Sequence, residues 1–357
     1  MALHDQSRDM ISQKRQVKLA SPGMDILGPL QNLPGIWHSR GRGWNMIALP
    51  VAKAFTDGSF PPPYRVLMNQ YSENLRFTTV STKVPNRGIK PGPGGAADAT
   101  QFAVALDYQQ TVSQDVAEDF PKTDLAGDAG EDIHHEPGLW LNMVNELTNG
   151  LDIARLASVP HGNSVLALGR SDHYDGGARE MPPLIGAIPI TSGLPIGHLP
   201  LDFDEDRYMA PYHHYIANPF MGNVSGVPGF PGFNPKDMNE ILRFAHGDGS
   251  NVANTTQLTV DSRIESGGVV NIPFIEKQAD AVSMKSTFWI QEMKDLETDG
   301  PRKGKSRQRL LYSQVVMLEF FAPRQDGLPG RIEWPHISIN TLDKVSDDGF
   351  GDAPPIK

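Results

Sequence analysis

The sequence predicts an all-β protein, an antiparallel barrel of about ten strands, and three observations carry this prediction. The 35 glycines and 30 prolines lie between short runs of alternating polar and apolar residues, as is typical of an all-β chain with many turns. Only one segment has a helical pattern. Finally, Leu33-Pro-Gly-Ile-Trp-His38 and Trp334-Pro-His-Ile-Ser-Ile-Asn340 place a Trp near a His at opposite ends of the chain. Because the first and last strands of a closed barrel are neighbours, these two segments are expected to meet beside one cavity.

Composition excludes several classes of protein. The net charge of -10, from 42 acidic and 32 basic residues, argues against a nucleic-acid partner, which needs a concentrated positive field. The one basic cluster, residues 302–309, follows Asp299-Gly300-Pro301 and is interpreted as a solvated hairpin tip. The absence of cysteine excludes disulfides, iron–sulfur clusters and a Cys nucleophile. It fits a reducing compartment, and we expect a cytoplasmic protein.

The chain divides into three parts. Residues 1–32 are expected to be a flexible leader. Within it, residues 1–23 are polar and mixed in charge and lack the apolar core of a secretory signal. Residues 33–342 form one barrel domain with an insertion at about 169–250, and residues 343–357 form a disordered acidic tail. Residues 181–201 carry no charge, but prolines at positions 182, 183, 189, 195 and 200 argue against a membrane span.

The strands are expected in order along the chain, the first with a glycine-rich kink at Gly41-Arg-Gly43. The clearest covers residues 102–112, where large apolar side chains alternate with small or polar ones. Residues 315–321 are apolar on both faces, so one face is expected at the cavity and the other under an insertion or, in a homodimer, a partner subunit. The predicted strands are residues 35–50, 64–71, 75–84, 102–112, 139–143, 153–159, 164–168, 255–262, 268–274, 281–293, 310–321 and 334–342.

The insertion holds the one predicted helix, residues 234–247. Asn234 can cap it, Pro235 suits its first turn, and Gly247 suits its C-terminal exit. Its apolar stripe consists of Met238, Ile241, Leu242 and Ala245.

His336 is the first candidate for chemistry. On a strand it shares a face with Trp334, Ser338 and Asn340. If that face is outside, His336 is a surface residue. If it lines the cavity, His336 can bind a haem iron or act as a general base, with Asn340 orienting a ligand.

Two further histidine segments have weaker patterns. In His134-His135-Glu136, neighbouring side chains face opposite sides of a strand, so only one histidine can enter the cavity and a cupin-type metal site is not expected. His161 sits at a turn, where it either bonds the backbone or reaches a ligand at the barrel rim. No Gly-x-Ser-x-Gly elbow, Walker A loop or dinucleotide fingerprint is present, so hydrolase and nucleotide chemistry are not supported.

Several segments together resemble the β-barrel proteins described as haem-binding or peroxidase-like, whose calycin-like fold is similar to that of nitrobindins and fatty-acid-binding proteins. The resemblance runs from about residue 33 to residue 342. Its segments are Leu33-Pro-Gly-Ile-Trp37, Val84-Pro-Asn-Arg-Gly88, His135-Glu-Pro-Gly-Leu-Trp140, Val159-Pro-His-Gly162, Gly267-Gly-Val-Val-Asn-Ile-Pro-Phe274, Ser286-Thr-Phe-Trp-Ile290 and Trp334-Pro-His-Ile-Ser338.

This resemblance implies a haem b site. In nitrobindin-like barrels the iron ligand is a histidine near the C-terminus, and His336 matches that place, with His161 or His135 on the distal side. Arg87 or Arg155 would assist peroxide cleavage in a peroxidase-like oxidoreductase. The predicted haem-contacting side chains are Trp37, Tyr108, Trp334 and Asn340.

Two other functions remain open at this point. The barrel can bind a lipid-like or aromatic metabolite without haem in an apolar pocket with a few polar anchors. It can also be a cofactor-free enzyme of lipocalin-like type, in which His336 or His161 moves a proton on a small hydrophobic substrate.

Overall fold

The fold is a single large antiparallel sheet closed on itself, described by a computed structural model. The model describes residues 27–51, 63–79, 84–86, 89–98, 101–143, 151–159, 162–176, 183, 186–191, 194–195, 206–224, 226–272, 279–321, 324 and 329–356. The strands are β1 (Gly35–Pro50), β2 (Tyr64–Thr79), β3 (Val84–Asn86), β4 (Ile89–Gly92), β5 (Gly95–Asp98), β6 (Gln101–Phe120), β7 (Asp132–Asn142), β8 (Ile153–Ala157), β9 (Ser164–Asp175), β10 (Ile190–Thr191), β11 (Leu194–Pro195), β12 (Val252–Asp261), β13 (Gly268–Val270), β14 (Ala279–Leu296), β15 (Ser306–Phe320) and β16 (Glu333–Ser346).

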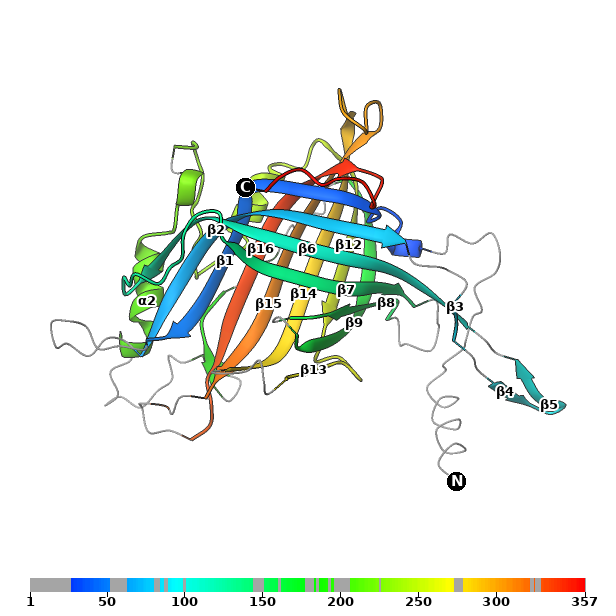
Figure 1. Ribbon diagram of the computed structural model, residues 1–357, viewed down its shortest axis with the longest axis horizontal. Coiled ribbons are helices and arrows are strands. Elements are labelled where there is room, and N and C mark those ends of the chain that lie inside the picture. The colour runs from blue at the N-terminus through cyan, green and yellow to red at the C-terminus, as the bar shows by residue number, and fades with distance from the viewer. Residues whose placement is uncertain are drawn as a thin grey trace.

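Ten of these strands form a closed ring. They follow the order β1-β2-β6-β7-β8-β9-β12-β14-β15-β16, and β16 pairs back onto β1. The closing pair is antiparallel, with Ile36 opposite Ser346 and Asn45 opposite Ser338. Figure 1 shows β1 in blue beside β16 in red, although they lie at opposite ends of the chain. The predicted all-β antiparallel class and the strand number are therefore confirmed.

Several strands are longer than the sequence pattern predicts, and β2 and β9 show the physical reason. The pattern places a break between residues 71 and 75, but β2 runs unbroken through the polar residues Ser72, Glu73 and Asn74. Ser72 and Glu73 are fully buried, so their polarity marks an internal hydrogen-bonded cluster and not a turn. Likewise β9 continues past residue 169 to Asp175, because its exposed polar end pairs with β12.

The helices lie between β9 and β12: α2 (Asp206–Ala217), the short 3-10 turn η3 (Gly222–Val224) and α3 (Glu240–His246). The predicted helix at 234–247 begins six residues later than expected. Asn234 Oδ1 accepts the Lys236 N–H at 2.9 Å, which forms a local turn in place of a helix cap. Gly247 ends α3 as predicted, with φ +67°. The sequence pattern missed α2, which contains Pro211. No helix in the described part of the chain is long and apolar enough to cross a membrane.

The ring opens along part of its closing seam. The β1–β16 pairing stops at Met46 and Ile337, while β1 continues along β2 to Pro50. At Glu333, β16 pairs instead with Ile190 of β10. Here Trp334 packs in an aromatic cluster whose other members are Tyr64, Tyr208 and Tyr212, with the Trp334 and Tyr64 ring centroids 4.0 Å apart. Two of these tyrosines belong to α2, so α2 is anchored beside this seam.

Both ends of the described chain pack against the ring. Leu30, in the 3-10 turn η1 (Gly28–Leu30), is fully buried, so residues 27–32 are not the flexible leader that the sequence predicts. The tail after Ser346 differs from the predicted disorder in the same way. Asp347 pairs with Arg302 and with Lys305 Nζ at 2.6 Å. The predicted hairpin between β14 and β15 is present. Arg302, at its tip, is not solvated as the sequence predicts: it is buried and holds the C-terminal segment through Asp347.

Candidate functional site

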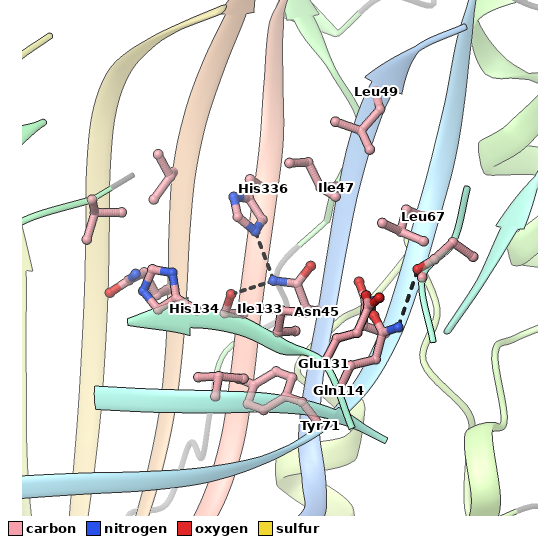
Figure 2. A pocket seen from close by; sticks show the side chains of 18 of the residues that line it. Asn45, Ile47, Leu49, Leu67, Tyr71, Gln114, Glu131, Ile133, His134 and His336 are labelled. Atoms are coloured by element: carbon pink, nitrogen blue, oxygen red, sulfur yellow. Dashed lines mark hydrogen bonds between the residues drawn. The ribbon is translucent and has the colours of Figure 1, made fainter. Parts of the chain in front are cut away.

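The ring encloses a cavity of about 390 Å³, a size common for small-molecule sites. Side chains from β1, β2, β6, β7, β15 and β16 line it, and Leu125, Ala126, Gly127 and Glu131 of the β6–β7 loop contribute to one side. Gln114 holds this loop, because its Nε2 donates to the Asp128 carbonyl at 3.0 Å. Figure 2 shows the lining side chains converging from β1, β2 and β16 and from the β6–β7 hairpin.

The strand register arranges the lining in layers. One layer is apolar apart from His336: Ile47 lies opposite Leu67, and Val316 lies opposite His336. The next layer along the same strands is polar, with Asn45 opposite Asn69 and Gln314 opposite Ser338. Tyr71 and Tyr312 follow, and their hydroxyl oxygens are 2.9 Å apart. The cavity thus passes from an apolar end to a hydrogen-bonding end.

His336 is fixed across the seam by Asn45. The Asn45 side-chain amide donates to His336 Nε2 at 2.8 Å and to Ser338 Oγ at 3.0 Å. Figure 2 shows this pair joining β16 to β1 at the cavity wall. Of the two orientations that the sequence left open for this face, the structure has His336 and Ser338 in the cavity lining.

Glu73 lies behind the two tyrosines and has no exposed surface. It accepts hydrogen bonds from Gln110 Nε2 at 2.8 Å, Tyr312 Oη at 2.7 Å and Asn340 Nδ2 at 2.7 Å. Burial raises the pKa of Glu73 above its ordinary value and outweighs the lowering effect of these three donors. Asn340 therefore holds a buried carboxyl and does not itself line the cavity.

A second buried carboxyl, Glu136, has a cation beside it. Arg155 Nη2 donates to Glu136 Oε1 at 2.5 Å, and Tyr108 also donates its hydroxyl to that oxygen. Burial alone would raise the pKa of Glu136, but Arg155 and His134 together lower it to about 2. His134 Nε2 lies 3.2 Å from Glu136 Oε2, and the His134 ring lines the cavity. Glu136 is thus an anion that orients a cavity histidine.

Of the neighbouring histidines His134 and His135, the sequence analysis assigned the site role to His135, and the structure has His134 in the cavity lining. His135 is exposed, whereas His134 enters the cavity two residues before Glu136. Strand alternation shows that only one of two neighbouring histidines points inward, but not which one. Glu136 could have identified the inward-facing histidine, because it lies two residues after His134 and so shares a strand face with it.

The other predicted contact residues do not line this cavity. Trp37 is buried, and its Nε1 donates to the Leu33 carbonyl at 2.8 Å. Trp334 belongs to the seam cluster, and Tyr108 is buried behind the wall, where Arg155 Nε donates to its hydroxyl at 3.0 Å. His161 and Arg87 lie outside the described residues. The sequence pattern missed Asn45, Glu73 and Gln314, since isolated polar residues in strands carry no local signal of an interior position.

The residues present do not fit haem b. His336 Nε2, the ring nitrogen most suited to bind iron, is engaged by Asn45 at 2.8 Å. No Lys or Arg is among the described residues that line the cavity, so the two haem propionates would lack a cationic partner there. In the described parts of the chain, no three His, Asp or Glu side chains gather in a way that could hold a metal ion.

Comparison with models of protein families, with curated proteins and with solved structures gives no match to this chain. The resemblance read from the sequence segments therefore stays a prediction. The geometry of the cavity is the remaining basis for a functional conclusion.

Proposed function

We propose that this protein binds a small, electrically neutral molecule that carries a hydrogen-bonding head group and an apolar body. The observation that supports this is the layered cavity. Ile47, Leu67 and Val316 form its apolar part, and the amides of Asn45 and Gln314 lie in the neighbouring polar layer. Burial of the apolar body away from water is favourable, and a neutral head group can replace its hydrogen bonds to water with hydrogen bonds to these amides.

The charges around the cavity support a neutral ligand over an anion. The described lining holds one acidic side chain, Glu131, and no Lys or Arg. Arg155 is a buried cation that contacts the lining residue Gln314, and Glu136 already neutralises it. A carboxylate that entered would lose its water without gaining an ion pair, which is costly. This disfavours fatty acids as well as haem.

A matched pair of ligands tests this proposal. 3-Phenylpropanamide and 3-phenylpropanoate have nearly the same shape and differ in head-group charge, and isothermal titration calorimetry gives both dissociation constants. We expect the amide to bind at least tenfold more tightly, a difference of about 1.4 kcal/mol or more. Asn45→Leu should remove this preference, because it deletes an amide of the polar layer. His173→Ala, at an exposed position of β9, is the control and should bind both as wild type does.

Two outcomes would overturn the proposal. The first is equal or tighter binding of the carboxylate, or binding of neither ligand. The second is a stoichiometric Soret band on titration with hemin that shifts in His336→Ala. That result would restore the haem prediction and assign His336 as the iron ligand.

A further inference from the structure

One buried arginine organises two cavity groups that come from different strands. Arg155, on β8, has a side chain only 3% exposed. Its Nη2 donates to Glu136 of β7 at 2.5 Å, and its Nη1 donates to Gln314 Oε1 of β15 at 2.7 Å. Nη1 also donates to Ser286 Oγ at 2.9 Å. Since a guanidinium presents its donors in a rigid planar fork, Arg155 fixes Glu136 and Gln314 relative to each other.

The Glu136 branch ends at His134. Because the Glu136 carboxylate accepts the proton on His134 Nε2, Nδ1 becomes the basic nitrogen of the neutral ring. If the ring then gains a proton, the same carboxylate stabilises the imidazolium. Glu136 remains charged for this role because Arg155 lies beside it. A histidine held by a buried carboxylate at a cavity wall is a usual arrangement for a general base.

The Gln314 branch ends in a donor. Arg155 occupies the carbonyl oxygen of the Gln314 amide, which leaves the Nε2 group as the end that this lining residue can present to the cavity. An amide N–H held in place in this way can stabilise negative charge that develops on a ligand oxygen. Arg155 thus aligns a base and a donor toward one space.

We propose that the cavity catalyses proton transfer at carbon next to the carbonyl of a neutral carbonyl compound, with His134 as general base and Gln314 as oxyanion donor. This inference rests on the proposed function, since the substrate must first bind in the same cavity. The C–H bond breaks as His134 Nδ1 takes the proton, and the electron pair forms the carbon–carbon double bond of an enolate. The carbonyl π electrons move to oxygen, which accepts the Gln314 N–H. Return of a proton to carbon regenerates the carbonyl compound and neutral His134.

The experiment uses 4-phenyl-2-butanone, a neutral ketone with exchangeable hydrogens on both sides of its carbonyl, in D2O with the full-length protein. Deuterium incorporation is followed by mass spectrometry, and binding is followed in the same samples by saturation-transfer NMR. We expect exchange well above the buffer rate.

The variants separate catalysis from binding. His134→Gln should lower the exchange rate by about a hundredfold or more, with binding changed by less than about threefold. Gln314→Leu should lower the rate by about a hundredfold. His135→Gln changes the exposed neighbour and is the matched control, expected at the wild-type rate. Glu136→Gln would weaken exchange too, but it breaks a buried ion pair, so His134→Gln carries the test.

Binding without exchange, or exchange that survives His134→Gln, would overturn this inference and leave the proposed function intact. If the ketone does not bind but 3-phenylpropanamide does, the cavity rejects the substrate class and the inference fails on that ground. If neither neutral ligand binds, both proposals fail.

Discussion

At the scale of single residues, the cavity shows how the surroundings decide the state of a buried acid. Glu73 and Glu136 are both fully buried beside the same cavity. Glu136 has Arg155 as a partner, and its pKa is about 2. Among the described residues, the donors to Glu73 are the neutral side chains of Gln110, Tyr312 and Asn340, and burial raises its pKa. The pKa values of these two buried carboxyl groups are therefore shifted in opposite directions, and the Arg155 guanidinium beside Glu136 is the main cause of the difference.

The two acids affect stability with opposite signs. Glu136 contributes stability above its unfolded pKa of 4.5, and this contribution is lost as the pH falls toward about 2. Glu73 has a raised pKa in the folded state, so its contribution is fully present below 4.5 and is lost as the pH rises through the folded value.

Glu73→Gln tests this sign. The amide has nearly the same shape but cannot ionise, so the variant should lack the loss of stability that Glu73 causes above pH 4.5. We expect the free energy of unfolding of the variant, relative to wild type, to be higher at pH 7.5 than at pH 4.5. Urea unfolding at both pH values measures this difference. A relative stability that does not change with pH would show that Glu73 ionises as readily in the folded protein as in the unfolded chain.

At the scale of elements, the shape of β1 is set by its glycines. The predicted kink at Gly41-Arg-Gly43 is confirmed: the register of β1 against β2 shifts between Ser39 and Gly43, and Gly41 has φ +61°. Gly43 faces the ring of Tyr71, and a Cβ at Gly43 would lie 2.0 Å from Tyr71 Cε2. The kink therefore makes room for an aromatic side chain of the cavity.

Gly43→Ala should destabilise the protein by roughly 1–3 kcal/mol, because the added methyl group displaces a packed ring. It should also weaken binding of 3-phenylpropanamide, since Tyr71 lines the cavity. Thermal unfolding and calorimetry measure the two effects. Gly268→Ala is the control: a Cβ there meets nothing within 4 Å, and stability should change by less than about 0.5 kcal/mol. Equal effects of the two substitutions would contradict the steric explanation.

The boundaries of the strands show where the sequence pattern predicts the structure correctly and where it does not. The limits of β1, residues 35–50, follow from its pattern because its apolar alternation is local. The break predicted inside β2 is wrong because Ser72 and Glu73 are satisfied by partners from β6, β15 and β16, which no local window contains. Long-range contacts also limit prediction of the site. Alternation places Trp334, His336 and Ser338 on one strand face, but only the last two line the cavity. Trp334 lies where the seam is open, and it contacts Tyr208 of α2 there.

At the scale of the whole molecule, the ring buries its polar groups by connecting distant strands. The Asn45–His336 hydrogen bond joins residues 291 positions apart, and the Glu73–Asn340 bond joins residues 267 apart. On the outer face of β15, Val315 and Met317 line a groove together with Pro183 and Gly186 of the insertion. Interior and exterior are thus defined only once the ring closes, which is why composition predicts the fold class but not which strand face carries the site.

A closed ring has no first strand. Ile36 of β1 pairs with Ser346 of β16, so the first and last strands of the chain are neighbours in the ring. A chain that begins at a different strand could therefore form the same set of strand pairs. A circular permutant that joins the two ends through a flexible Gly/Ser linker and opens between Gly247 and Asp248, after α3, should keep the β-rich circular dichroism spectrum and unfold in one cooperative step. An insoluble or molten permutant would show that the order of synthesis, and not only the set of strand pairs, is needed to close the barrel.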